Sequence, residues 1–307
     1  MTETRWQWRE QREQKAFLAL EDGTVYRGHS VGAPCDGLGE VVFNTGMTGY
    51  QEIVTDPSYH GQIVAMTYTE IGNTGINADD PESRDIFVNG FVVNALNEPN
   101  NWRSQTSLRQ YLAASGIPAI AGIDTRALTG KLRQAGTLKG VLAVSGDVSE
   151  EEAVARARGW EGLDGQDYAS KVAVAEPFSW DRDGTMSSSW GMPASLPDTD
   201  LRIVAYDYGI KWNILRRLRQ QGMDVTVVPA STPPEDVLAR NPDGVFLSNG
   251  PADPAGVHYA VDAIGKLIGK VPLMGICLGH QLIGLALGGK TRRLKFGHHG
   301  CNHPVMD

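Results

Sequence analysis

Apolar runs alternate regularly with amphipathic stretches over the second half of the chain. The apolar runs RIVAYDYG, DVTVVPA, GVFLSNG and VPLMGIC each have the length and composition of a buried strand. Between them, helical spacing of apolar residues predicts helices over 211–221, 233–240 and 259–268, and a further apolar helix begins near residue 278. Strands and helices in alternation predict a parallel sheet covered by helices on both faces.

The first half is richer in predicted strands. Residues 17–27 contain two short apolar runs around Asp22-Gly23, a typical hairpin signal. Further strands are predicted in GEVVFN (39–44), QIVAMTY (62–68), IFVNGFVV (86–93), PAIAGI (118–123) and KGVLAVS (139–145). Helices are predicted over 108–114 and 125–134, and Ser149 opens another. The pattern indicates a mixed, β-rich α/β domain.

A polar, irregular stretch separates the two patterns. Residues 179–200, SWDRDGTMSSSWGMPASLPDTD, are rich in Ser, Gly, Pro and Asp, although Trp180 and Trp190 indicate that part of the stretch packs on a domain. We therefore divide the chain of 307 residues into an extension (1–16), a first domain (17–170), a linker (171–200) and a second domain (201–307).

Cys277 stands where the predicted buried strand 271–276 turns into the last helix, which runs into Gly288-Gly289. A helix N-terminus carries a partial positive charge, which favours a thiolate over a thiol. The N–H of Leu278 points at the same place and could stabilise an oxyanion. Both effects suit a nucleophile that attacks a carbonyl carbon.

A cysteine at a strand end is more often a small buried apolar residue than a nucleophile. Here Gly275 and Gly279 flank Cys277 as G-x-C-x-G, a spacing typical of a nucleophile elbow, in which small neighbours permit a sharp turn. The polar pair His280-Gln281 in an otherwise apolar helix also favours the nucleophile.

Four motifs carry a resemblance to a known family. GICLGHQ (275–281) resembles the nucleophile motif of class I glutamine amidotransferases, and FLSNGPADP (246–254) resembles their glycine-rich loop. KFGHHGCNHPV (295–305) and VVFNTGMTGYQEIVTDPSY (41–59) narrow the resemblance to the small, glutaminase subunits of carbamoyl-phosphate synthetases. It covers about residues 17–307 and implies a class I amidotransferase domain with a mainly parallel sheet after the first domain.

The resemblance also implies the roles of individual residues. Cys277 attacks the side-chain amide of L-glutamine and forms a thioester, with release of ammonia. The glutamine is held by Gly250, Leu278 and Gln281 of the second domain and by Ser58 of the first. On sequence alone, Ser58 is a turn residue after Pro57. The family's loop usually reads G-P-G-D-P, whereas Ala252 occupies the second glycine position, so a second loop contact is in question there.

The remaining chemistry is expected in a partner. The resemblance implies a large synthetase subunit that binds ATP and magnesium, receives ammonia through a tunnel and makes carbamoyl phosphate for arginine and pyrimidine synthesis. This chain contains no phosphate loop of the form G-x-x-x-x-G-K-[ST], and we predict no cofactor site in it. His298, His299 and His303 lack a visible acidic second shell, so we predict no metal site, and Cys301 receives no role.

The family's His-x-Glu pair, which completes the catalytic triad, and an Asn-His-Gly-Phe segment lie beyond position 307. We therefore expect the sequence to be a fragment with an incomplete amidotransferase domain. Two alternatives remain open: a truncated, catalytically inactive binding subunit, and an amidotransferase with a different acceptor.

Composition narrows the partners and the compartment. A net charge of -8 argues against nucleic acid and acidic membranes as main partners. Three cysteines without paired spacing suggest no disulfide framework. The charged first fifteen residues do not resemble a signal peptide, and no apolar run approaches membrane-spanning length, so a cytoplasmic location is expected.

Overall fold

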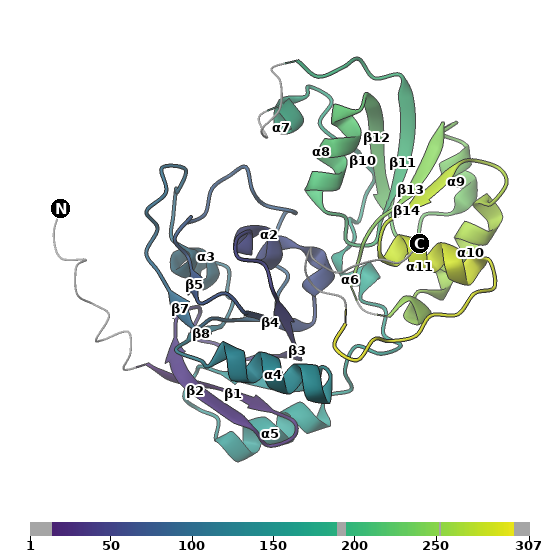
Figure 1. Ribbon diagram of the computed structural model, residues 1–307. Helices are drawn as coiled ribbons and strands as arrows, with labels where there is room; N and C mark the ends of the chain where they lie inside the picture. The colour runs from purple at the N-terminus through teal and green to yellow at the C-terminus, as the bar shows by residue number, and fades with distance from the viewer. Residues whose placement is uncertain (1–13, 189–194, 252, 298–307) are drawn as a thin grey trace.

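A computed structural model describes residues 14–188, 195–251 and 253–297. In Figure 1 the chain forms a barrel from its first half and an open sheet with flanking helices from its second half. The barrel strands, in their order around the barrel, are β1 (Lys15–Leu20), β2 (Val25–Ser30), β8 (Ala119–Ala121), β6 (Gly90–Val92), β4 (Gln62–Met66), β3 (Gly37–Asn44) and β9 (Leu138–Ala143).

The barrel mixes antiparallel and parallel pairing. The predicted hairpin is confirmed, because β1 and β2 pair antiparallel around a turn in which Gly23 has a φ of 94°. β3, β4, β6 and β8 run parallel to one another, and β9 closes the barrel by pairing antiparallel with both β1 and β3. Two short strands, β5 (Glu70–Ile71) and β7 (Ala95–Leu96), form a separate parallel pair.

Alternate residues of the barrel strands face two different cores. On β4, Ile63 and Ala65 point into the barrel with Leu128 and Leu132, whereas Val64 and Met66 pack outside it. The helices of this half are α2 (Tyr50–Thr55), the short 3-10 helix η1 (Pro57–Tyr59), α3 (Leu108–Ala114), α4 (Thr125–Ala135) and α5 (Glu150–Gly159). Ser149 caps α5 as predicted, since its hydroxyl accepts the N–H of Glu152.

The second half forms a sheet in the order β10 (Phe178–Ser179), β12 (Met223–Pro229), β11 (Leu201–Asp207), β13 (Gly244–Leu247) and β14 (Leu273–Gly275). All neighbours pair parallel except β10, which runs antiparallel at one edge. The helices are α6 (Ala169–Val172), α7 (Thr185–Ser188), α8 (Trp212–Gln220), α9 (Pro234–Leu238), the short η2 (Pro254–Gly256), α10 (His258–Leu267) and α11 (Leu278–Ala286).

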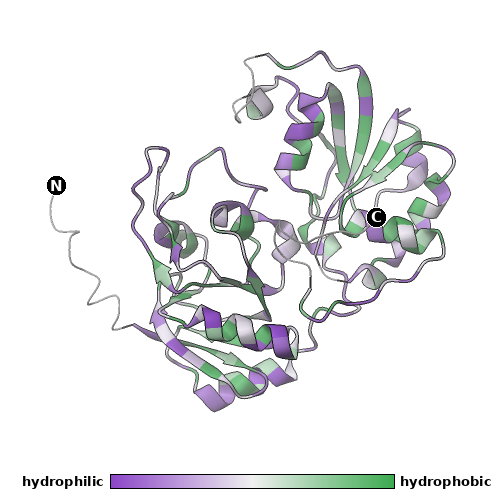
Figure 2. Cartoon of the chain, in the orientation of Figure 1, coloured by the Kyte–Doolittle hydropathy of each residue, from purple (hydrophilic) through white to green (hydrophobic). Residues whose placement is uncertain are grey.

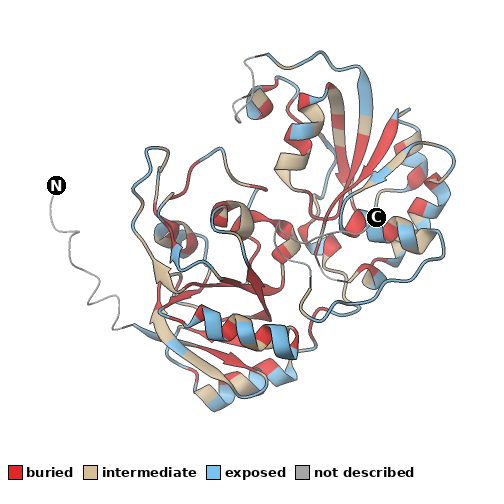
Figure 3. Ribbon diagram, in the orientation of Figure 1, coloured by how far each residue is buried: buried red, intermediate tan, exposed pale blue. Residues whose placement is uncertain are grey.

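Both faces of this sheet are covered, as the sequence predicts. On β11, Val204 and Tyr206 pack toward α9, α10 and α11, whereas Ala205 packs toward α8. Figure 2 shows the apolar strands between more polar helices, and Figure 3 shows the central strands buried. The predicted fold class, a β-rich α/β domain followed by a mainly parallel amidotransferase-type sheet, is confirmed.

Two local features depart from the sequence pattern. A strand within the predicted range 271–276 is confirmed as β14, but it covers only Leu273–Gly275 and is not buried as predicted, since its Met274 is 58% exposed. Among the described residues β14 pairs with β13 alone, so its other side is an open edge. Within the predicted linker, β10 joins the second sheet and Trp180 is 3% exposed, since its ring packs beside Trp212.

A strap after α11 returns to the barrel. Arg293 pairs with the buried carboxylate of Glu40 and with Asp164, and the N–H of Thr137 donates to the carbonyl of Lys295 at 3.1 Å. Phe296 packs on Phe43 with ring centroids 5.9 Å apart, so the segment that follows the nucleophile helix touches the barrel core.

Candidate active site at Cys277

Cys277 occupies a sharp turn between β14 and α11. Its backbone has a φ of 52° and a ψ of -110°, a region that L residues rarely adopt. The turn is held from both sides, because the N–H of Ile276 donates to Leu247 and the N–H of Gly279 donates to Ser248, each at 3.0 Å. The sulfur is therefore presented at the carboxyl end of the sheet, as the elbow motif predicts.

Gly275 and Gly279 are required at this turn because a side chain at either position would clash with the backbone. A Cβ on Gly279 would lie 2.2 Å from the carbonyl oxygen of Leu247, and a Cβ on Gly275 would lie 2.6 Å from the backbone of Gly279. Strand and helix thus pass at a distance that only glycine permits at these two positions.

The electrostatics of the thiol differ from the sequence expectation. Desolvation raises the pKa of Cys277 above its usual value, although the residue reaches solvent. The N–H of Leu278 lowers the pKa, as the helix start predicts, but this effect is the smaller one. The predicted influence of the helix start is therefore present, but desolvation outweighs it and the net shift of the thiol pKa is upward.

The loop after β13 lies directly beside the nucleophile turn. A Cβ on Gly250 would meet the carbonyl oxygen of Tyr208 at 2.2 Å and the side chain of Leu278 at 2.7 Å. Asn249, immediately before it, is buried and donates to the hydroxyl of Ser58 at 2.9 Å. Ser58, Gly250 and Leu278, which are distant in sequence, are thus brought to one place.

Gln281 lies one helical turn after Cys277, and its N–H donates to the carbonyl of Cys277 at 3.0 Å. Its side chain is exposed on α11. Ala252 and the histidines at 298, 299 and 303, together with Cys301, lie outside the described residues.

A charged pair at the domain boundary was missed by sequence reasoning. The ammonium of Lys211, just before α8, lies 3.6 Å from the carboxylate of Asp56, which also accepts the N–H of Ser58 at 2.8 Å. Both charges act on Cys277: Asp56 raises the pKa of the thiol, and Lys211 lowers it. The signal was available in the D-P-S-Y motif, where an aspartate precedes the serine by two residues.

Burial acts on both members of this pair. Desolvation raises the pKa of the Asp56 carboxyl, while Lys211 and the Ser58 N–H oppose the rise. Desolvation lowers the pKa of Lys211, but the carboxylates of Asp56 and Glu82 outweigh it, so the net shift is upward. Lys211 therefore stays charged, and its N–H donates to Asn249, in the loop beside the nucleophile turn, at 3.2 Å.

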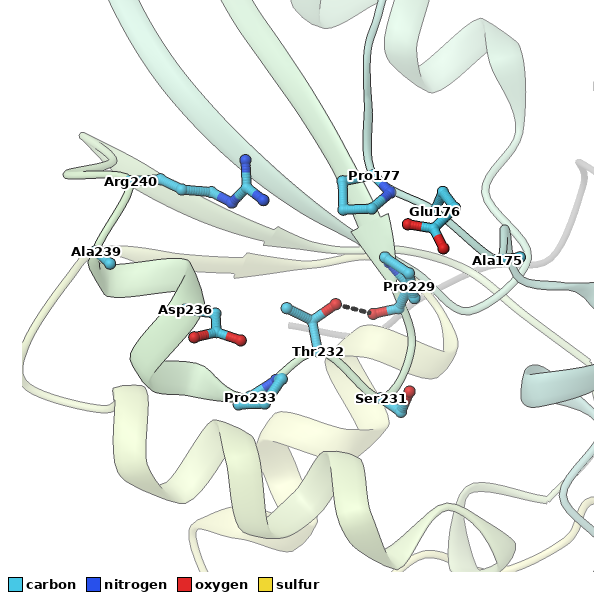
Figure 4. Close-up of a pocket in the computed structure, with 10 residues that line it drawn as sticks. All are labelled: Ala175, Glu176, Pro177, Pro229, Ser231, Thr232, Pro233, Asp236, Ala239 and Arg240. Carbon is cyan, nitrogen blue, oxygen red and sulfur yellow. Dashed lines mark hydrogen bonds between the residues drawn. The ribbon is translucent and has the colours of Figure 1, made fainter.

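Among residues 14–188, 195–251 and 253–297, no group of three or more His, Cys, Asp or Glu side chains is placed to hold a metal ion. A cavity of about 530 Å³ lies beside α9, lined by Glu176, Asp236 and Arg240 among others (Figure 4). Cys277 does not line it. Over the same described ranges, every helix is too short or too polar to cross a bilayer.

The fold and the site define a two-part protein whose second part is a class I glutamine amidotransferase domain. The family model for "Glutamine amidotransferase class-I" matches residues 204–307. The model for "Carbamoyl-phosphate synthase small chain, CPSase domain" matches residues 18–142.

Similar proteins agree with both matches. The carbamoyl phosphate synthase small chain of Thioalkalivibrio sulfidiphilus is 52% identical over 294 residues, covering 95% of this chain and 77% of that protein. That of Pseudomonas aeruginosa is 50% identical over 300 residues, with 95% and 78% covered. A chloroplastic small chain from Oryza sativa is 50% identical over 293 residues, with 95% and 65% covered. The chain belongs to the family of carbamoyl phosphate synthase small chains.

Proposed function

We propose that this chain is the glutaminase subunit of a glutamine-hydrolysing carbamoyl-phosphate synthetase and that Cys277 is its nucleophile. The sulfur attacks the side-chain amide carbon of L-glutamine, so that a C–S bond forms and the C–N bond breaks. The thiol proton leaves with the nitrogen as ammonia. Water then cleaves the thioester, which gives glutamate and restores the thiol.

Each tetrahedral intermediate of this reaction carries an oxyanion. The N–H of Leu278, at the start of α11, is aimed at the sulfur and lowers the pKa of the thiol. The same group would stabilise the oxyanion, and one such donor contributes about 10²–10³ in rate in other acyl-transfer enzymes. The family resemblance assigns the proton shuttle to a His-x-Glu pair.

The polar ends of glutamine need partners on both sides of the domain boundary. We assign Gly250, Leu278 and Gln281 from the second domain, and Ser58 from the first, to this binding. The hydrogen bond between Asn249 and Ser58 supports this assignment, because it holds the hydroxyl of the first domain beside the loop that carries Gly250.

The partner we propose is a large synthetase subunit, which receives the ammonia and joins it to bicarbonate with ATP and magnesium. This chain has no phosphate loop of the form G-x-x-x-x-G-K-[ST], so ATP chemistry belongs to that partner. The carbamoyl phosphate would serve arginine and pyrimidine synthesis, in the cytoplasm.

The observation that carries the proposal is the strained turn at Cys277, with Leu278 and Gly250 packed around it. The test is glutamate release from L-glutamine by the full-length protein, alone and with its large subunit, beside a Cys277→Ser variant. We expect hydrolysis by the wild type, a glutamyl adduct on Cys277 after acid quench, and a loss of at least about 10³-fold in the variant.

Two outcomes would contradict the proposal. Glutamate release that persists in the Cys277→Ser variant would place the nucleophile elsewhere. A wild type that binds the large subunit but releases no glutamate would favour a binding subunit over an enzyme.

A further inference from the structure

Helix α8 begins at the domain boundary, and its first free N–H groups are satisfied by the other domain. The N-cap residue of α8, Lys211, provides no side-chain cap. Instead, the backbone carbonyl of Glu82 accepts the N–H of Trp212 at 2.7 Å, and the carboxylate of Glu82 accepts the backbone N–H and the side-chain amide of Asn213, each at 2.9 Å. A residue of the first domain thus caps a helix of the second.

Glu82 is itself fixed to the segment that carries Asp56 and Ser58. Its N–H donates to the hydroxyl of Thr55 at 2.9 Å, and Thr55 is the last residue of α2, directly before Asp56. Glu82 is only 5% exposed, so its carboxylate has little water to compensate for a lost partner. The cap on α8 and the ion pair with Lys211 therefore rest on one rigid unit of the first domain.

Lys211 sits between these two attachments. Asp56 pairs with its ammonium, while Glu82 holds the two residues that follow it. The guanidinium of Arg216, one turn further along α8, donates to the carbonyl of Pro81 at 3.2 Å and to Asn213 at 2.7 Å, which extends the same joint. The N–H of Lys211 donates to the side-chain oxygen of Asn249 at 3.2 Å, so a shift of the α8 start would move Lys211 away from the loop beside the nucleophile turn.

We propose that Glu82 is a positioning residue of the active site: by capping α8 from across the domain boundary, it holds Lys211 beside the loop of Asn249 and Gly250, which packs on the nucleophile turn. The inference rests on the proposed function only where it concerns glutamine hydrolysis. The position of Lys211 itself is tested through the reactivity of the Cys277 thiol, which needs no glutamine. Glu82 makes this contribution because its side chain is long enough to accept the N–H of Asn213, not because it is charged.

The charge of the Glu82 carboxylate and the length of its side chain predict opposite changes in Cys277 reactivity, which makes the proposal testable. The Glu82 carboxylate lies near Lys211 and partly offsets its positive charge. If charge alone mattered, Glu82→Gln would strengthen the field of Lys211 and make Cys277 more reactive, while Glu82→Asp would change little. If reach matters, Glu82→Gln keeps an acceptor for the Asn213 N–H, whereas Glu82→Asp is one methylene too short.

The experiment follows alkylation by iodoacetamide at the Cys277 peptide, by mass spectrometry, in the full chain between pH 6.5 and 9.5. We expect Glu82→Gln to stay within about twofold of the wild type and Glu82→Asp to react about three- to tenfold more slowly near pH 7.5, since a thiol pKa higher by up to one unit lowers the thiolate fraction by up to tenfold. Lys211→Met should slow the reaction at least as much.

A double-mutant cycle then separates positioning from general loosening of the fold. In a Lys211→Met background, Glu82→Asp should add less than about twofold, because both changes remove one interaction. Glu40→Ala is the matched control, since Glu40 is equally buried and also crosses to the second domain, through Arg293. We expect it to lower stability and leave the alkylation profile unchanged.

The proposal is overturned if Glu82→Gln accelerates alkylation while Glu82→Asp does not slow it, or if Glu82→Asp retains its full effect without Lys211. It also fails if Glu82→Asp lowers the melting temperature with no change at Cys277, which would leave a purely structural cap. None of these outcomes depends on glutamine turnover, so a wild type that fails to hydrolyse glutamine would refute the proposed function alone.

Discussion

The two halves of the molecule meet at Cys277 but encode their shares of the site differently. The second half supplies the nucleophile through local stereochemistry: a strand end, a strained residue and two glycines that nothing larger could replace. The first half supplies Ser58, Asp56 and Glu82 through contacts that span more than 100 positions, such as the bond between Glu82 and Asn213. A local steric requirement can be predicted from a sequence motif, whereas a contact between domains becomes visible only in the folded structure.

The largest expected effect comes from a substitution that disrupts the local geometry of the nucleophile turn. Gly279→Ala would push a Cβ to within 2.2 Å of the Leu247 carbonyl, a backbone atom that has no room to yield. We expect a loss of about 3 kcal/mol in unfolding free energy from overpacking, together with a disordered nucleophile turn. Urea denaturation and the rate of Cys277 alkylation measure the two effects.

Gly284→Ala is the control in the same helix. Its Cβ would meet no atom within 4 Å, so the substitution should stabilise α11 by about 0.5–1 kcal/mol. Equal losses in both variants would mean that α11 is sensitive to any change and that the turn has no special requirement.

A second substitution tests the long-range half alone. Ser58→Ala removes the hydroxyl that accepts from Asn249 and that we assign to glutamine. Because a hydrogen bond to a charged group contributes about 1.5–3 kcal/mol, KM for glutamine should rise at least about tenfold, with kcat and Cys277 alkylation changed far less. Steady-state glutaminase kinetics decide this, with the exposed Ser170→Ala as the control.

If Ser58→Ala instead lowers kcat and slows alkylation together, the first domain acts on the nucleophile itself. The comparison would then need revision, because Ser58 would belong with Asp56 and Lys211 in setting the reactivity of the thiol.

Sequence reasoning captured the local half well. The hairpin at Asp22-Gly23, helix 108–114 and the turn at Cys277 were all predicted, because each depends on spacing, capping or a short glycine pattern. Closure of the barrel by β9 was not predicted, since its pairing with β1 joins residues that lie more than 100 positions apart. The net direction of the Cys277 pKa also escaped prediction, because desolvation depends on what packs around the sulfur.

The raised thiol pKa has a consequence for stability. A group whose folded pKa lies above its unfolded value stabilises the fold below the unfolded pKa, and this contribution disappears as the pH rises through the folded value. The free energy of unfolding of the wild type should therefore fall relative to Cys277→Ala above about pH 8.5, the usual pKa of a free cysteine. Urea titrations of both proteins between pH 7 and 10 measure the difference, and a gap that widens in favour of the wild type would contradict the sign.

The smallest expected effect concerns two stacked tyrosines at the end of β11, and it tests how much the stability of the second half depends on their hydroxyl groups. The ring centroids of Tyr206 and Tyr208 are 5.9 Å apart, and the two rings are nearly parallel. The hydroxyl of Tyr206 donates to the carbonyl of Thr232 at 3.0 Å, whereas the buried hydroxyl of Tyr208 has no partner among the described residues. Removing a satisfied hydroxyl and removing an unsatisfied one should shift stability in opposite directions.

We expect Tyr206→Phe to cost about 1 kcal/mol and Tyr208→Phe to gain up to about 1 kcal/mol, because only the second substitution relieves a desolvated polar group. Thermal and urea unfolding of the two variants provide the measurement, and each serves as the other's control for the loss of a phenolic oxygen. A destabilised Tyr208→Phe variant would mean that the hydroxyl is satisfied by a buried water. Tyr208, whose carbonyl lies next to Gly250, would then stabilise this region through its hydroxyl as well.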